Sequence, residues 1–97
     1  MANVEKTPKQ LERHLKGLAH QKRIQILLLL GKKGNTGLTL DNIAEITKLH
    51  PKNISHHARK LELAGLVDKT FSNRQLVLLL SPYGKSLYKL ITTFSLS

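Results

Sequence analysis

Two adjacent histidines, His56 and His57, stand in the stretch HPKNISHHARKLELAGL, which runs from His50 to Leu66. An imidazole can bind a metal ion, transfer protons near neutral pH, touch a nucleic acid or pack against apolar neighbours. Which of these applies depends on the elements that hold the two side chains and on the rest of the chain.

Metal and proton chemistry fit the histidine spacing poorly. Neighbouring side chains on a helix diverge by about 100°, so His56 and His57 are badly placed to share one ion. His50 falls on another face, and the stretch lacks an H-E-x-x-H spacing. No acidic or nucleophilic residue recurs nearby at a helpful spacing. We therefore expect no metal, no cofactor and no enzyme activity.

The net charge points to a polyanionic partner. Sixteen Lys and Arg against six Asp and Glu give a net charge of +10. Such an imbalance favours nucleic acid first and an anionic membrane surface second, although a basic protein can also be merely soluble. The apolar run Ile26–Leu30 is too short to cross a bilayer. The charged N-terminus lacks a signal-peptide pattern, and cysteine is absent, so we expect a cytoplasmic location.

Two helices are predicted in the first third of the chain. Thr7-Pro8-Lys9-Gln10 has the pattern of a capped helix start, and the helix should end near Gly17 and His20. A second helix, 21–32, is almost wholly apolar after Arg23 and should be the central buried one. We expect the first helix to present Leu11, Leu15 and Leu18 on one face, and the second to turn Ile24, Leu27, Leu28 and Gly31 inward.

A helix-turn-helix is predicted over 39–65. The loop 31–37 has a glycine spacing that does not match a phosphate-binding loop, and 36–38 suits a very short strand. Thr39 should cap a helix that ends near Leu49. His50 and Pro51 then suit the start of a second helix, 51–64, which Gly65 should terminate.

The remainder predicts a wing and a final helix. Residues 66–80 read as a β-hairpin with its turn at Ser72-Asn73, and Ser81-Pro82 as another helix start. The order α-α-(β)-α-α-β-β-α describes a mainly α winged helix-turn-helix in a single domain, 1–97. Its terminal helices lie within 1–20 and 82–97. The last helix carries an apolar stripe of Tyr83, Leu87, Leu90, Ile91 and Phe94.

Three segments carry a family resemblance: LAHQKRIQILLLL, LTLDNIAEITKLHPKNISHHARKLELAGLV and LLLSPYGKSLYKLI. Together they resemble the ArsR-type winged-helix repressors of bacteria and archaea and, more loosely, MarR-type proteins. Small archaeal or archaeal-virus transcription factors are also similar in size and basicity. The resemblance implies a homodimeric, sequence-specific DNA-binding regulator. The family's metal-sensing activity is not implied, because LDNIAEITK has no cysteine and 83–97 has neither histidine nor an acidic residue.

The helix 51–64 should present one face to DNA. With Ile54, Ala58 and Leu61 packed inward, His57 borders the core and His56 faces outward, where protonation would strengthen DNA binding as pH falls. Arg59 suits a guanine and Asn53 an adenine, whereas lysines and serine suit phosphates. The outward residues are Lys52, Asn53, Ser55, His56, Arg59 and Lys60. A solvated basic face is the alternative.

The wing and the terminal helices complete the prediction. Lys69, Ser72, Asn73 and Arg74 should gather near the hairpin tip, where an arginine could enter a minor groove, although the tip could also be simply a charged turn. Lys32 and Lys33 are further candidates for phosphate contacts. The leucine-rich terminal helices should form a dimer interface that matches a palindromic operator, unless they pack within the monomer. The competing functions are a sequence-independent architectural chromatin protein and a protein-interaction module.

Overall fold

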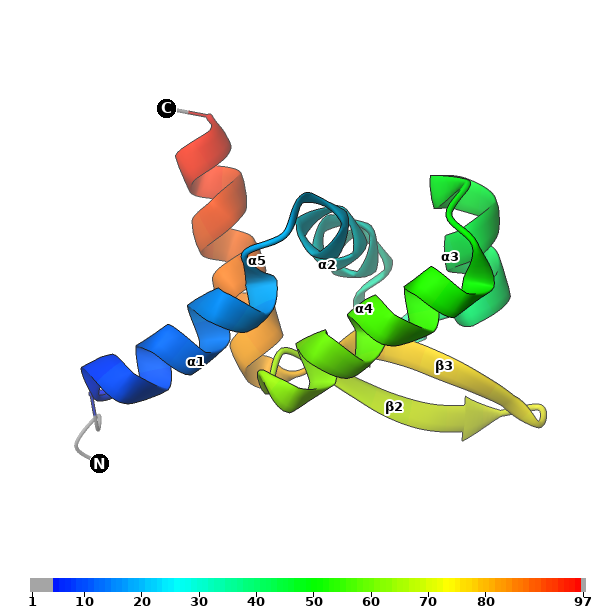
Figure 1. Cartoon of the computed structure of the whole chain (residues 1–97), viewed down its shortest axis with the longest axis horizontal. Helices are drawn as coiled ribbons and strands as arrows, with labels where there is room; N and C mark the ends of the chain where they lie inside the picture. Colours follow the sequence, from blue (N-terminus) through cyan, green and yellow to red (C-terminus); the bar gives the residue numbers. More distant parts are fainter. Residues whose placement is uncertain (1–4, 97) are drawn as a thin grey trace.

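The computed structural model describes residues 5–96, which form five α-helices, one short 3₁₀ helix and a small antiparallel sheet (Figure 1). The ends of the predicted terminal segments, residues 1–4 and 97, lie outside the described residues. The predicted winged helix-turn-helix order is confirmed. The elements are α1 (Pro8–Leu18), α2 (Gln21–Lys33), a 3₁₀ helix (Gly34–Thr36), β1 (Leu38–Thr39), α3 (Leu40–Thr47), α4 (Pro51–Leu63), β2 (Val67–Ser72), β3 (Gln75–Leu80) and α5 (Pro82–Ser95).

The predicted capping residues start their helices. The hydroxyl oxygen of Thr7 accepts the backbone N–H of Gln10 at 3.2 Å, and the amide oxygen of Gln10 accepts the backbone N–H of Thr7 at 2.8 Å. His50 caps α4, since its Nδ1 accepts the backbone N–H of Lys52 at 3.1 Å. His20 caps α2 through Lys22 in the same way, also at 3.1 Å. His20 therefore begins a helix, whereas the sequence suggested only that it ends one.

The sheet has the strand order β1-β3-β2, and its hairpin corrects the predicted turn by one residue. Ser72 pairs with Gln75, so the turn residues are Asn73 and Arg74. Both have positive φ, 52° and 64°, as in the two-residue turns that match the twist of a hairpin. β1 begins at Leu38 instead of residue 36, because Gly34–Thr36 form the 3₁₀ helix.

The core lies where α2 packs against α4, α5 and β3. Its fully buried side chains are Ile26, Leu27, Leu30, Ile43, Ile54, Leu61, Leu66 and Leu78. For α2 the inward set was only partly predicted. Leu27 is buried as expected, but Ile24 and Leu28 are half-buried, while Ile26 and Leu30 are fully buried. An all-apolar helix with neighbours on several sides has no single inward stripe that its periodicity could reveal.

α3 ends at Thr47, two residues before the predicted end. Lys48 takes a left-handed conformation with φ 62°, and its N–H reaches the carbonyl oxygen of Ala44 at 2.8 Å. This sharp reversal sets α4 at an angle to α3 (Figure 1). Within residues 5–96, none of the helices is both long and apolar enough to cross a bilayer.

Candidate nucleic-acid interface

The helix α4 divides into an inner and an outer face. Ile54, Ala58 and Leu61 are 0%, 1% and 0% exposed, which confirms the predicted packed stripe. The structure leaves the opposite side of the helix accessible along its whole length. Exposed there are Lys52, Asn53, Ser55, His56, Arg59 and Lys60. The donors and acceptors proposed to meet DNA therefore stand on one accessible surface.

The paired histidines lie in different environments, as predicted. His57 is buried among α2 and α4, whereas His56 is exposed. The His57 ring centroid lies 4.6 Å from that of His20 and 5.6 Å from that of His56. Burial lowers the pKa of His57 below its ordinary value, and the neighbouring charges, first His20 and then Arg23, add to this effect. Residues 5–96 contain no group of three or more histidine or acidic side chains positioned to hold a metal ion.

The wing does not gather all the residues predicted at its tip. Lys69 lies in the middle of β2, opposite Leu78, because the true turn is one residue later than expected and the hairpin is long. Its ammonium group lies 3.1 Å from the carboxylate of Glu62 on α4. Asn73 and Arg74 do occupy the tip, where both are exposed. The wing is thus held against α4 by the Lys69–Glu62 ion pair, and its basic tip projects away from the helices (Figure 1).

Two further lysines lie at the end of α2 that is farther from His57. Lys32 and Lys33 are exposed in the last turn of α2. His20, which touches His57 of α4, caps the other end of that helix. A helix of this length spans roughly 20 Å, so the two lysines are well separated from the His20–His57 contact.

Three cations that the sequence did not assign to DNA lie beside α4. Arg13 and Lys16 of α1 and Arg23 of α2 line a hollow that Lys60 of α4 also lines. For Arg13 and Lys16 the sequence signal is the polar face of the first helix, whose prediction rested on its leucines, whereas Arg23 lies near the start of the second helix. That Arg13 and Lys16 reach α4 depends on how α1 crosses it.

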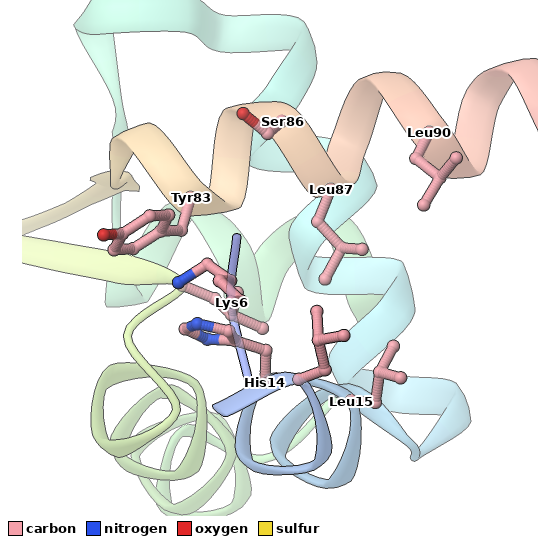
Figure 2. A pocket seen from close by; sticks show the side chains of 9 residues that line it. Lys6, His14, Leu15, Tyr83, Ser86, Leu87 and Leu90 are labelled. Atoms are coloured by element: carbon pink, nitrogen blue, oxygen red, sulfur yellow. The ribbon is translucent and has the colours of Figure 1, made fainter. Parts of the chain in front are cut away.

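A second hollow separates α1 from α5 and is mainly apolar (Figure 2). It measures about 260 Å³. Figure 2 shows Lys6, His14 and Tyr83 together, with Leu15, Leu87 and Leu90 beside them. Several large apolar side chains on these two helices remain exposed: Leu11, Leu15, Tyr83, Leu90 and Phe94. The predicted stripes are thus only partly covered within one chain, where Leu18 is buried and Leu87 and Ile91 are half-buried.

Solved structures share this fold. HlyU from Vibrio cholerae is 23% identical, covers 97% of this chain and 100% of its own, and superposes with a TM-score of 0.82. The homodimeric winged helix-turn-helix DNA-binding domain of Mb0332 from Mycobacterium bovis is 24% identical, with coverages of 98% and 90% and a TM-score of 0.80. MepR from S. aureus, solved as a DNA complex, is 20% identical, with coverages of 88% and 72% and a TM-score of 0.75. No curated protein matches the chain.

The family is shown by the sequence itself. The profile of the bacterial regulatory proteins of the arsR family matches residues 20–69. The matched region begins at the cap of α2, contains the helix-turn-helix and reaches into β2. It covers about half of the chain, and the fold of the whole chain agrees with it. The protein therefore belongs to the arsR family of bacterial regulatory proteins and is a sequence-specific DNA-binding regulator of transcription.

Proposed function

We propose that the chain acts as a homodimeric repressor that inserts α4 into the major groove of its operator. The observation that carries this proposal is the division of α4, whose inner face is fully buried while its outer face presents six exposed polar side chains. A helix held so firmly on one side can present its other side to base edges without reorganising. The net charge of +10 favours the approach to DNA.

Individual roles follow from side-chain chemistry. Arg59 can form two parallel hydrogen bonds with guanine, and Asn53 can do the same with adenine. Lys52, Ser55 and Lys60 suit phosphate oxygens, which position the protein without specifying a sequence. His56 lies on the same exposed face and can donate to either kind of acceptor.

The wing supplies the second contact. Asn73 and Arg74 at its tip suit the minor groove beside the half-site, where a narrow groove attracts arginine. The ion pair with Glu62 supports a second role for Lys69, beside the DNA contact predicted from the sequence. We propose that Lys69 braces the wing against α4, so that only part of its side chain is free to contact DNA.

Association through α1 and α5 explains the apolar surface. Both helices lie on the side of the molecule opposite to the wing tip (Figure 1). Exposed leucines on two neighbouring helices are the kind of patch that marks an interface. The Mb0332 domain, which has a similar fold, is homodimeric, and this supports the association of two copies of this chain. Two copies related by a two-fold axis would place two α4 helices about one helical turn of DNA apart.

A random duplex pool tests the function directly. Selection of bound sequences should yield a palindromic motif, and the purified chain should prefer it over random DNA by about a thousandfold or more. The logarithm of affinity should fall linearly with that of the salt concentration. Binding without any sequence preference would point to an architectural protein. No duplex binding at moderate salt would overturn the proposal and favour a protein partner.

A further inference from the structure

Four cationic side chains from three helices surround one hollow. Arg13 and Lys16 come from α1, Arg23 from α2 and Lys60 from α4, and Gly17, Leu63 and Ala64 complete the lining. The hollow measures about 370 Å³. Among residues 5–96, no acidic side chain takes part in the lining.

Close packing of α1 on α4 creates this arrangement. A Cβ atom placed on Gly17 would overlap the Cβ of Ala64, so only glycine allows the two backbones to approach this closely. The helices therefore touch at the Gly17–Ala64 contact, and the long side chains around it stand at the edges of the crossing. The Arg13 guanidinium lies near Gly65, because a Cβ atom placed on Gly65 would be 3.5 Å from the Nη2 atom of Arg13.

The charges around the hollow have little internal compensation. Of the four cations, Lys16 alone has an ion pair within the part of the chain that the structure describes. Its partner is Glu12 at 3.8 Å, and both side chains are largely exposed, so the pair is weak. The Nε atom of Arg23 is buried and has no hydrogen-bond partner among residues 5–96.

The chemistry of the ligand follows from the donors. Two guanidinium and two ammonium groups around one space, without a carboxylate, suit a compact group with several anionic oxygens, of which phosphate is the commonest. Lys60 also belongs to the exposed side of α4, so the hollow borders the surface assigned to DNA.

We propose that this hollow is a phosphate site and that it holds a backbone phosphate of the bound duplex, beyond the base pairs that α4 reads. This choice of phosphate source rests on the proposed function. The site would add Arg13, Lys16 and Arg23 to the groups that meet DNA and would position α1, and with it the dimer, on the duplex. A phosphate group on a small molecule offers the same chemistry, and duplex length distinguishes the two sources.

The first arm measures duplex binding by the double variant Arg13→Gln/Arg23→Gln against Lys85→Gln/Lys89→Gln, which removes the same charge from α5. We expect the first variant to bind selected and random DNA alike at least about tenfold more weakly than wild type. Its salt slope should be shallower by about one for each phosphate that it no longer neutralises. The control should keep nearly the wild-type slope. Thermal unfolding followed by circular dichroism shows whether both variants are folded. Arg23→Lys keeps the charge and should largely retain the slope.

The second arm separates the sources. Trimming the duplex outside the selected motif should weaken the binding of the wild-type protein, because it removes the backbone phosphate that the hollow holds. The affinity of the Arg13→Gln/Arg23→Gln variant should hardly change on trimming, because this variant no longer holds that phosphate. Inorganic phosphate is then titrated into DNA-free protein and followed by ³¹P NMR. Saturable binding that the double variant abolishes, without any effect of trimming, would support the site and assign it to a free phosphate group.

The inference is overturned if the double variant matches wild type in affinity and slope and the DNA-free protein shows no saturable phosphate binding. Failure of the proposed function looks different, because then the wild type itself binds no duplex. In that case the phosphate titration alone decides whether the hollow binds phosphate.

Discussion

The Nδ1 atom of His14, on α1, donates a hydrogen bond to the carbonyl oxygen of Ala64 at the end of α4, 2.5 Å away. The His14 ring is only 5% exposed and lies 5.3 Å from the ring of Tyr83 on α5. One imidazole thus joins the helix proposed to read DNA to both helices proposed to form the dimer. Because a carbonyl oxygen can only accept, Nδ1 must carry the proton in this contact.

Replacing His14 with alanine should destabilise the fold. The change removes a buried ring and leaves the Ala64 carbonyl without its partner, at a cost of about 2–3 kcal/mol. Urea unfolding at fixed protein concentration measures this cost. His56→Ala is the matched control, because this exposed histidine should change stability by no more than about 0.5 kcal/mol. Equal midpoints for the two variants would contradict the structural role of His14.

His57 should make stability depend on pH. Its pKa is lowered in the fold, first by burial and then by the neighbouring positive charges, while in the unfolded chain it titrates near 6.5. Below that pH the unfolded state binds more protons than the folded state. The free energy of unfolding should therefore be highest above about pH 6.5 and should fall as the pH drops toward the folded-state pKa. His57→Phe keeps a ring but cannot titrate, and its stability should therefore fall less than that of wild type between pH 7 and 5.5. Parallel urea titrations of the two proteins test this, and identical pH profiles would refute it.

Replacing Arg74 with glycine should stabilise the fold but weaken DNA binding. Arg74 holds a left-handed conformation, φ 64°, in the hairpin turn, a state that glycine adopts without penalty. Arg74→Gly should stabilise the fold by up to about 1 kcal/mol while weakening DNA binding, since the variant lacks a wing cation. Arg74→Ala removes the same charge without relieving the backbone, so it should weaken binding without the gain in stability. Unchanged affinity in both variants would remove Arg74 from the interface.

Glu62 should restrain both the wing and DNA binding. Its pair with Lys69 is partly exposed, so Glu62→Gln should cost less than about 1 kcal/mol of stability. The substitution also removes an anion beside the DNA-facing side of α4 and frees the Lys69 ammonium group. We expect tighter binding to all duplexes and a steeper salt dependence. Fluorescence anisotropy over a salt series measures both, and a drop in affinity would show that the braced wing matters more than the freed charge.

Local signals account for what the sequence predicted well. The caps at Thr7, Thr39 and His50 and the end of α4 before Gly65 are each determined by a few consecutive residues, whose preferences the tertiary structure respects. The buried stripe centred on Ile54 follows from periodicity within one amphipathic helix.

Tertiary contacts between elements account for the rest. The Lys69–Glu62 pair depends on how β2 returns along α4, and the cationic hollow depends on the approach of Gly17 to Ala64. The buried Ile26 was missed because a nearly all-apolar helix shows no preferred face until its neighbours are known.

Leu90 should be necessary for dimerisation. It is 63% exposed on α5 and lines the apolar hollow between α1 and α5. A glutamate there would cost little in a monomer, where it would meet water, but much in a dimer, where its charge would be buried at the interface. Leu90→Glu should therefore shift the protein to monomers at micromolar concentration and lower affinity for a two-half-site operator at least about tenfold. Ile46→Glu is the control for association, because Ile46 is 49% exposed but lies on α3, on the other side of the molecule from α5 (Figure 1). Sedimentation equilibrium distinguishes the outcomes, and a dimeric Leu90→Glu protein would place the interface elsewhere.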